Sequence, residues 1–295
     1  MFVFIVSSPR SGSTVLGEIL AKHPKITHWY EPYFIWDFYH GPGINDQRTK
    51  NSASKKSATF IRREFELYLK KSGKDILLEK TPINSFKIEL INNLFPQAKF
   101  IHLIRDGRDV TRSIYREWQT RRNISISFNP LATLNSILTT LKRQPYWRNR
   151  LQAIWYEIRT QHRLSGFITR NNNTWSTNVG WGPRFPNWQS ARNNLSLLEF
   201  CATQWYECES AIQAALEYVP ASQVLNVHYE DLVSQPNETL GRIFQFVDQR
   251  SDKYLRISDQ LDRKRMGQFE KYFDSNEKQK ILAIIQPLLS KLGYN

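Results

Sequence analysis

The chain has 295 residues, of which 40% are hydrophobic and 13% aromatic, so it can fill a substantial core and is not disordered throughout. Its formal net charge of +14 favours a polyanionic partner: a nucleotide, a nucleic acid, an acidic glycan or an anionic membrane. No stretch approaches the roughly 18 apolar residues of a membrane-spanning helix, and no signal peptide is recognisable, so we expect a cytoplasmic protein.

Short apolar runs typical of buried parallel strands recur along the chain, and helical patterns follow most of them. The runs cover residues 2–6, 76–78, 100–104 and 224–227. Strands that alternate with helices predict an α/β protein with a P-loop-like, three-layer fold, in which helices flank a central parallel sheet. We expect a single domain over residues 1–295.

One segment, residues 120–196, differs in composition from the rest of the chain. It holds ten arginines and one lysine against a single acid, a net +10 of the total +14, together with five of the nine tryptophans. Its later part is rich in Asn, Gly and Pro. We therefore predict a loop-rich insertion.

The first strand runs into a loop of small residues, Ser-Ser-Pro-Arg-Ser-Gly-Ser-Thr at positions 7–14, and then into a helical pattern over residues 15–20. Such a loop offers backbone N–H groups and a helix amino terminus to an anion. The alternative is an ordinary turn capped by Ser or Thr. The position after the first strand of a parallel sheet favours the anion site.

This loop differs from the ATP-binding P-loop in its cation. The residue after Gly12 is Ser13 instead of Lys, and the positive charge is displaced to Arg10. The strand over residues 100–104 ends in Arg105 and not in an Asp that would hold Mg²⁺. We expect a phosphorylated ligand and no metal site.

Two segments resemble signatures of the sulfotransferases that use 3'-phosphoadenosine 5'-phosphosulfate (PAPS). Residues 8–14 resemble the loop that holds the 5'-phosphosulfate, and residues 105–113 resemble the element that grips the 3'-phosphate through Arg105 and Ser113. An arginine at the end of a buried strand can fork two phosphate oxygens while a hydroxyl on the next helix donates to a third. The resemblance implies that the 5' end is held by Pro9, Arg10, Ser11, Gly12, Ser13 and Thr14.

Lys80 follows the second predicted strand, in a place where the resemblance implies a catalytic lysine. With Arg10, it is expected to stabilise the charge that develops on the leaving 5'-phosphate. A solvated lysine at a strand end is the alternative. The histidine base of the cytosolic small-molecule sulfotransferases would lie two residues beyond, where this chain has Pro82.

Glu31 is the candidate general base, on a layout that is similar to the tyrosylprotein and carbohydrate sulfotransferases. In those families an Arg-Ser-Gly-Thr-Thr loop, a helix and a His-Pro pair precede a catalytic Glu; this chain has Arg-Ser-Gly-Ser-Thr at 10–14 and His-Pro at 23–24. The alternatives are a loop acid paired with a surface cation, and Glu79 as the base.

The carboxy-terminal half carries two weaker resemblances. Tyr229, in Tyr-Glu-Asp-Leu, matches a tyrosine that contacts adenine, although a structural role explains the same pattern. Arg263 and Lys264 resemble a loop that folds over the 3'-phosphate, but Arg265 and Phe269 depart from that loop's pattern. The residue that stacks on adenine stays open.

Taken together, the resemblance implies an O-sulfotransferase that uses PAPS as donor and releases 3'-phosphoadenosine 5'-phosphate (PAP). We expect the insertion over residues 120–196 to shape the acceptor side of the site. The expected acceptor is a hydroxyl of an anionic glycan, because tryptophan rings stack on sugars and arginine binds carboxylate or sulfate with two donors. A lipid headgroup at a membrane surface or a small molecule is the alternative. A kinase-like P-loop enzyme is disfavoured by the missing Lys and Asp, and a nucleic-acid-binding protein by the lack of a recognisable motif.

Overall fold

The structure of the protein is a computed structural model. It describes residues 1–37, 45–124, 149, 151–152, 181–249, 261 and 263–294.

Within these ranges, five parallel strands form one sheet in the order β2-β3-β1-β4-β5. The strands are β1 (Phe2–Val6), β2 (Ile26–Tyr30), β3 (Ile76–Lys80), β4 (Lys99–Ile104) and β5 (Val224–His228). The predicted α/β fold with a central parallel sheet is confirmed. The strand β2 was not predicted, and the physical reason is its place at the sheet edge, where Thr27 and His28 are only half-buried and interrupt the apolar run.

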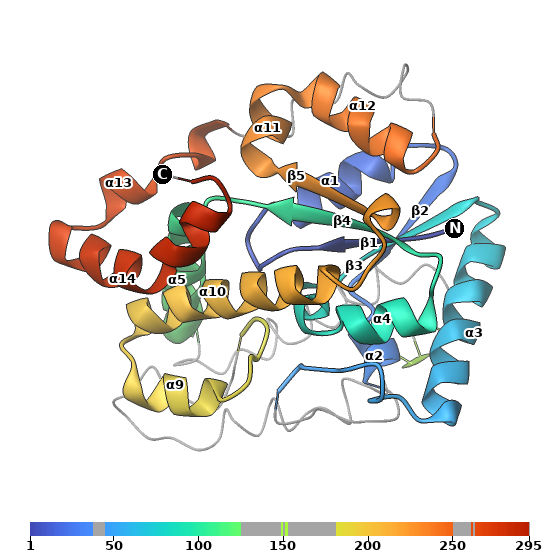
Figure 1. Ribbon diagram of the computed structural model, residues 1–295, viewed down its shortest axis with the longest axis horizontal. Helices are drawn as coiled ribbons and strands as arrows, with labels where there is room; N and C mark the ends of the chain where they lie inside the picture. The colour runs from blue at the N-terminus through green and yellow to red at the C-terminus, as the bar shows by residue number, and fades with distance from the viewer. Residues whose placement is uncertain are drawn as a thin grey trace.

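Helices connect the strands and continue to the carboxyl end of the described chain (Figure 1). The α-helices are α1 (Ser13–Leu20), α2 (Tyr33–Trp36), α3 (Lys55–Ser72), α4 (Ile88–Leu94), α5 (Gly107–Ile124), α9 (Trp188–Asn194), α10 (Leu197–Leu216), α11 (Tyr229–Ser234), α12 (Pro236–Phe246), α13 (Phe269–Tyr272) and α14 (Ser275–Lys291). The short 3-10 helices are η1 (Pro82–Phe86), η2 (Ala221–Gln223) and η4 (Arg263–Arg265).

Alternate residues of each strand point to opposite faces, so the sheet builds two hydrophobic cores. Phe4 of β1 packs into the core that holds residues of α2, α3 and α4, whereas Val3 and Ile5 pack against α1, α11 and α12. Figure 1 shows α1, α11 and α12 on one side of the sheet and α4 and α10 on the other. The three-layer arrangement follows directly from strands that are apolar on both faces.

A third apolar cluster joins α5, α9, α10 and α14 beside the carboxyl ends of the strands. Trp205 of α10 is fully buried in it and lies against Gly107, the first residue of α5. A Cβ at position 107 would lie 2.5 Å from the indole ring, so only glycine lets the two helices approach this closely. This contact fixes the start of α5, which follows the end of β4.

Most of the basic segment, residues 120–196, lies outside the described residues. Where it is described, residues 120–124 complete α5, residues 181–187 form neither helix nor strand, and residues 188–194 form α9. The single-domain prediction and the insertion stay predictions. In the part of the chain that the structure describes, no helix combines the length and the apolarity needed to cross a membrane.

Candidate active site

All five strands run in the same direction, so their carboxyl ends meet at one edge of the sheet, where open α/β sheets bind ligands. Most of the predicted site residues lie at or just beyond these ends. In spatial order from β2 to β5, the strand ends present Glu31, Lys80, the loop over residues 7–12, Arg105 and Tyr229. At about 4.8 Å between neighbouring strands, the row spans roughly 20 Å.

The loop after β1 has a sharply turned backbone and leads into a helix whose amino terminus could hold an anion. Arg10 and Gly12 both have left-handed backbone, with φ of 68° and 95°, and the Ser8 and Ser11 hydroxyls lie 2.7 Å apart. No side chain caps the amino terminus of α1, which begins at Ser13. The first N–H groups of the helix are therefore left for another acceptor. A Cβ at Gly12 would lie 2.6 Å from the Tyr229 ring, so the loop packs tightly against the first residue of α11.

Arg10 reaches across to α5. Its Nε donates to the Ser113 hydroxyl at 3.2 Å, and its Nη1 lies 3.7 Å from a carboxylate oxygen of Glu117. Ser113 lies in the second turn of α5. The structure thus brings together the two residues predicted to hold opposite ends of a nucleotide, and Glu117 is a neighbour that no sequence motif indicated.

Arg105, directly after β4, is buried, with 5% of its surface exposed. Its guanidinium lies over the Tyr229 ring, 4.5 Å from the centroid. Nη1 donates to the carbonyl of Arg10 at 3.1 Å and Nη2 to the carbonyl of Arg265 at 2.6 Å. The Nε atom is buried without a hydrogen-bond partner. The Nε donor of this fixed cation is therefore left for a ligand, which fits the predicted phosphate contact.

Asp109 holds the later loop in place. Its carboxylate accepts hydrogen bonds from the backbone N–H groups of Gly267 at 2.7 Å and Phe269 at 2.9 Å. Both carboxylate oxygens of Asp109 thus accept from backbone donors. Asp109 ties the chain after η4 to α5, and it leaves Arg263 and Lys264 exposed on η4.

Glu31 and Lys80 form an ion pair at the other end of the row, with 2.5 Å between Lys80 Nζ and Glu31 Oε1. The Lys80 side chain is 4% exposed and the Glu31 side chain 20%. The ammonium also lies 4.8 Å from the centroid of the Tyr30 ring. Glu31 has left-handed backbone, with φ of 46°. Lys80 is therefore not a solvated lysine, and Glu31 is the member of the pair that solvent reaches more easily.

Glu79, the alternative base, is fully buried, and its carboxylate is occupied. It accepts hydrogen bonds from the Thr81 hydroxyl, from Asn84 Nδ2 at 2.5 Å and from Trp36 Nε1 at 3.5 Å. A carboxylate in this position cannot reach an acceptor hydroxyl from solvent. It instead joins α2, which follows Glu31, to η1, which follows Lys80.

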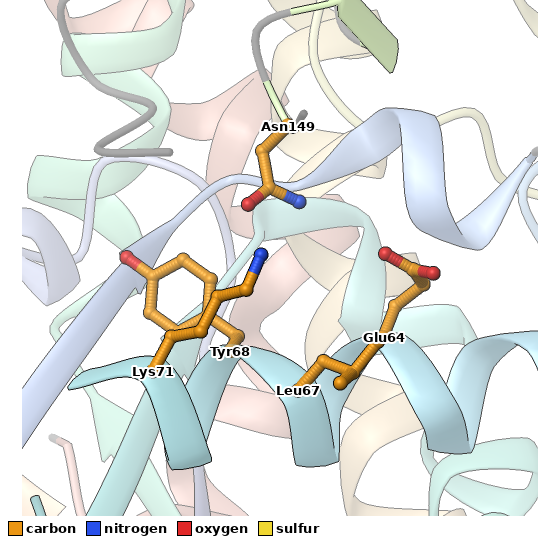
Figure 2. Close-up of a pocket in the computed structure, with 5 residues that line it drawn as sticks. All are labelled: Glu64, Leu67, Tyr68, Lys71 and Asn149. Atoms are coloured by element: carbon orange, nitrogen blue, oxygen red, sulfur yellow. The ribbon is translucent and has the colours of Figure 1, made fainter. Parts of the chain in front are cut away.

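Two surface hollows lie elsewhere. Figure 2 shows one beside α3, lined by Glu64, Leu67, Tyr68, Lys71 and Asn149. The other lies between α10 and α14, with Tyr206, Gln213 and Pro287 among its lining residues. Neither is lined by any residue of the strand-end row.

The structure is a P-loop-like α/β fold with a row of charged side chains, most of them cationic, at its strand ends. The sequence matches the family model described as "Sulfotransferase family" over residues 3–164 and 169–252, so the chain belongs to the sulfotransferase family. The family predicted from the sequence is confirmed. The individual roles of the site residues stay predictions.

Curated relatives are similar to parts of the chain. Nodulation protein NoeE of Sinorhizobium fredii is 28% identical over 134 residues, which are 40% of this chain and 32% of the relative. Protein-tyrosine sulfotransferase A of Caenorhabditis elegans is 21% identical over 263 residues, 84% of this chain and 50% of the relative. The chain spans between a third and a half of the length of the curated relatives it matches.

Solved structures share the fold. The sulfotransferase domain from the curacin biosynthetic pathway superposes with a TM-score of 0.53 at 16% identity, covering 99% of this chain and 97% of that one. The sulfotransferase domain from the Synechococcus PCC 7002 olefin synthase gives a TM-score of 0.50 at 19% identity, covering 100% and 94%. At these identities the likeness concerns the fold alone.

The buried Glu79 makes a prediction about stability and pH. Burial raises the pKa of Glu79 from 4.5 to about 7, against the donors Thr81, Trp36 and Asn84, which favour the ionised form. The folded protein then holds a proton that the unfolded chain releases, so stability from this group is complete below pH 4.5 and falls as the pH rises through 7. We expect wild type to lose up to roughly 3 kcal/mol relative to Glu79→Gln between pH 5 and 8.

Urea unfolding at four pH values over this range measures the difference. Glu89→Gln, a change of an exposed acid on α4, is the matched control and should run parallel to wild type. Parallel curves for wild type and Glu79→Gln would contradict the raised pKa.

Proposed function

We propose that the protein is a PAPS-dependent O-sulfotransferase that transfers a sulfuryl group to an acceptor hydroxyl and releases PAP. The observation that carries this proposal is the order of the strand ends. The anion-binding loop lies in the middle, the Glu31–Lys80 pair lies on one side of it, and Arg105 with Tyr229 lies on the other. A nucleotide bound on one side and an acceptor on the other would meet at the loop.

The residues present suit the donor. In PAPS the 5'-phosphosulfate and the 3'-phosphate are two separate anionic groups. The uncapped amino terminus of α1 and Arg10 suit the first group. Arg105, with its unpartnered Nε, and Ser113 suit the second, and the exposed Arg263 and Lys264 can cover it from η4. The Tyr229 ring, already stacked on Arg105, is the proposed contact for adenine.

Glu31 is the proposed general base. The acceptor hydroxyl gives its proton to a carboxylate oxygen of Glu31, its oxygen forms the new S–O bond, and the S–O bond to the 5'-phosphate of PAP breaks. The Glu31 side chain is the partly exposed member of a pair whose other member is buried, so an acceptor can reach it from solvent. Fixed backbone at φ 46° limits the directions in which the carboxylate can point.

Lys80 serves both partners of the reaction. An ammonium has three N–H bonds, and one is directed to Glu31. The others can donate to the oxygen that becomes negative on the leaving 5'-phosphate. Because Lys80 is almost completely buried, this charge acts in a medium of low dielectric constant, where it stabilises the transition state more than it would in water.

For the acceptor we propose an anionic glycan. The support is the net +10 charge and the five tryptophans of residues 120–196. The relatives leave a second class of acceptor, because one of them is named a protein-tyrosine sulfotransferase. The hydroxyl is then either that of a sugar or that of a tyrosine.

The donor assignment predicts selectivity for the 3'-phosphate. Titration calorimetry should show that wild type binds PAP at least about tenfold more tightly than AMP, which lacks this group. Arg105→Lys should remove most of this preference, because the single ammonium of lysine cannot donate to both carbonyls and also replace the Nε donor. Arg108→Ala is the control, because Arg108, on the first turn of α5, forms an ion pair with Asp106 just before the helix. Equal affinities of wild type for PAP and AMP would contradict the donor assignment.

The base assignment predicts a separation of binding from turnover. Glu31→Gln should bind PAP within about threefold of wild type and lower kcat by about 100-fold or more, because the amide cannot accept the hydroxyl proton. Stopped assays with labelled PAPS measure kcat, and Glu89→Gln again serves as the control. A Glu31→Gln variant with wild-type kcat would rule out Glu31 as the base.

The acceptor assignment is tested with PAPS that carries label in its sulfuryl group. Wild type is incubated with panels of uronic-acid or sulfated glycans, neutral glycans, tyrosine peptides, lipids and small phenols. We expect the fastest label transfer to the anionic glycans. Transfer to peptides or phenols alone would reject the glycan and leave the donor chemistry intact.

A further inference from the structure

Two arginines of the basic segment have described side chains, and they differ in their surroundings. Arg184 forms a complete ion pair with Asp46: Nη2 lies 2.6 Å and Nε 3.2 Å from Asp46 Oδ1, and the backbone N–H of Arg184 donates to Oδ2 at 2.7 Å. This pair joins two segments far apart in the sequence. Arg184 is therefore a structural arginine.

Arg192, on α9, is more deeply buried and forms no ion pair with any acid in the described part of the chain. Arg192 is 5% exposed. Its Nε and Nη2 atoms are both buried, and neither has a hydrogen-bond partner in the described part of the chain. Its guanidinium lies over the ring of Trp188, one helical turn earlier, 5.6 Å from the centroid. Burial lowers the pKa of Arg192, and no charged group contributes to this shift.

The two unpartnered atoms are neighbours on one edge of the guanidinium. The N–H bonds of Nε and Nη2 point in parallel, which is the fork that binds both oxygens of a carboxylate or two oxygens of a sulfate. A buried cation with unmade hydrogen bonds costs several kcal/mol of stability. Buried polar groups in folded proteins are nearly always hydrogen-bonded, so an unpartnered pair of donors of this kind indicates a missing partner, such as a bound anion.

We propose that Arg192 is an oxyanion-binding site, in which the Nε and Nη2 edge takes a carboxylate or sulfate group and the Trp188 ring covers one face of the guanidinium. This inference rests on the surroundings of Arg192 and not on the proposed function. The same chemistry is offered by a free ion and by an acidic group on a larger ligand, such as a sulfated sugar.

The test measures sulfate binding with the donor site filled. Saturating PAP keeps inorganic sulfate from the loop after β1, and the effect of PAP alone, recorded separately, reports on the proposed function. Sodium sulfate is titrated against sodium chloride of equal ionic strength, and the thermal midpoint is followed for wild type, Arg192→Met, Arg192→Lys and Arg184→Met. A second series replaces sulfate with glucose 6-sulfate and uses glucose as the neutral control.

We expect the apparent Kd for sulfate to weaken by at least about tenfold in Arg192→Met and in Arg192→Lys, which keeps the charge but loses the fork. Arg184→Met should keep the sulfate response and lower the midpoint without ligand, because it leaves Asp46 unpaired. Arg192→Met should be at least as stable as wild type without ligand, since it replaces an uncompensated charge with an apolar side chain of similar length.

If wild type binds glucose 6-sulfate more tightly than sulfate, the oxyanion belongs to a larger ligand. If it binds sulfate more tightly, the ligand is a free ion. An unchanged sulfate response in Arg192→Met overturns the proposal. So does a wild type that responds equally to sulfate and chloride. A loss of stability in Arg192→Met as large as that in Arg184→Met also overturns it, because Arg192 would then have a structural partner.

Discussion

The architecture of the site depends on one buried guanidinium. Arg105 lies at the end of β4 and joins three other parts of the chain: the loop after β1 through the Arg10 carbonyl, the turn at Arg265, and the ring of Tyr229 after β5. Tyr229 in turn packs against Gly12. Since Nη1 and Nη2 each donate to a backbone carbonyl, the position of the unpartnered Nε is set by the fold before any ligand arrives. Preorganisation of this kind lowers the cost of binding a charged group.

The buried cations at the two ends of the strand-end row differ in the groups that compensate their charge. At the β2 and β3 end, a buried ammonium is compensated by a carboxylate within the protein. At the β4 end, the contacts of the cation within the described residues are with two carbonyl dipoles and an aromatic face. A compensated pair suits proton transfer, in which charge is created and removed, whereas an undercompensated cation suits a ligand that brings permanent negative charge.

Four of the five strands could be predicted from the sequence, and the proposed site residues could be placed near their ends, because both are local signals. β1, β3, β4 and β5 give apolar runs in the sequence, and the loop signatures lie directly after two of them. The edge strand β2 escaped detection because its polar, half-buried residues break the run. The bond from Gly267 to Asp109 also could not be predicted, since it joins residues 158 positions apart. The contrast between Arg184 and Arg192 likewise depends on distant neighbours, and composition alone made them look alike.

Two residues assigned to the chemistry, Arg10 and Glu31, adopt a backbone geometry that glycine tolerates best. Each arrangement costs on the order of 1 kcal/mol for a side chain with a Cβ. Replacing either residue by glycine would relax the main chain and remove a functional group in the same step. A search for more heat-resistant versions of this protein would therefore tend to select inactive ones, so thermal tolerance and catalysis have to be screened together.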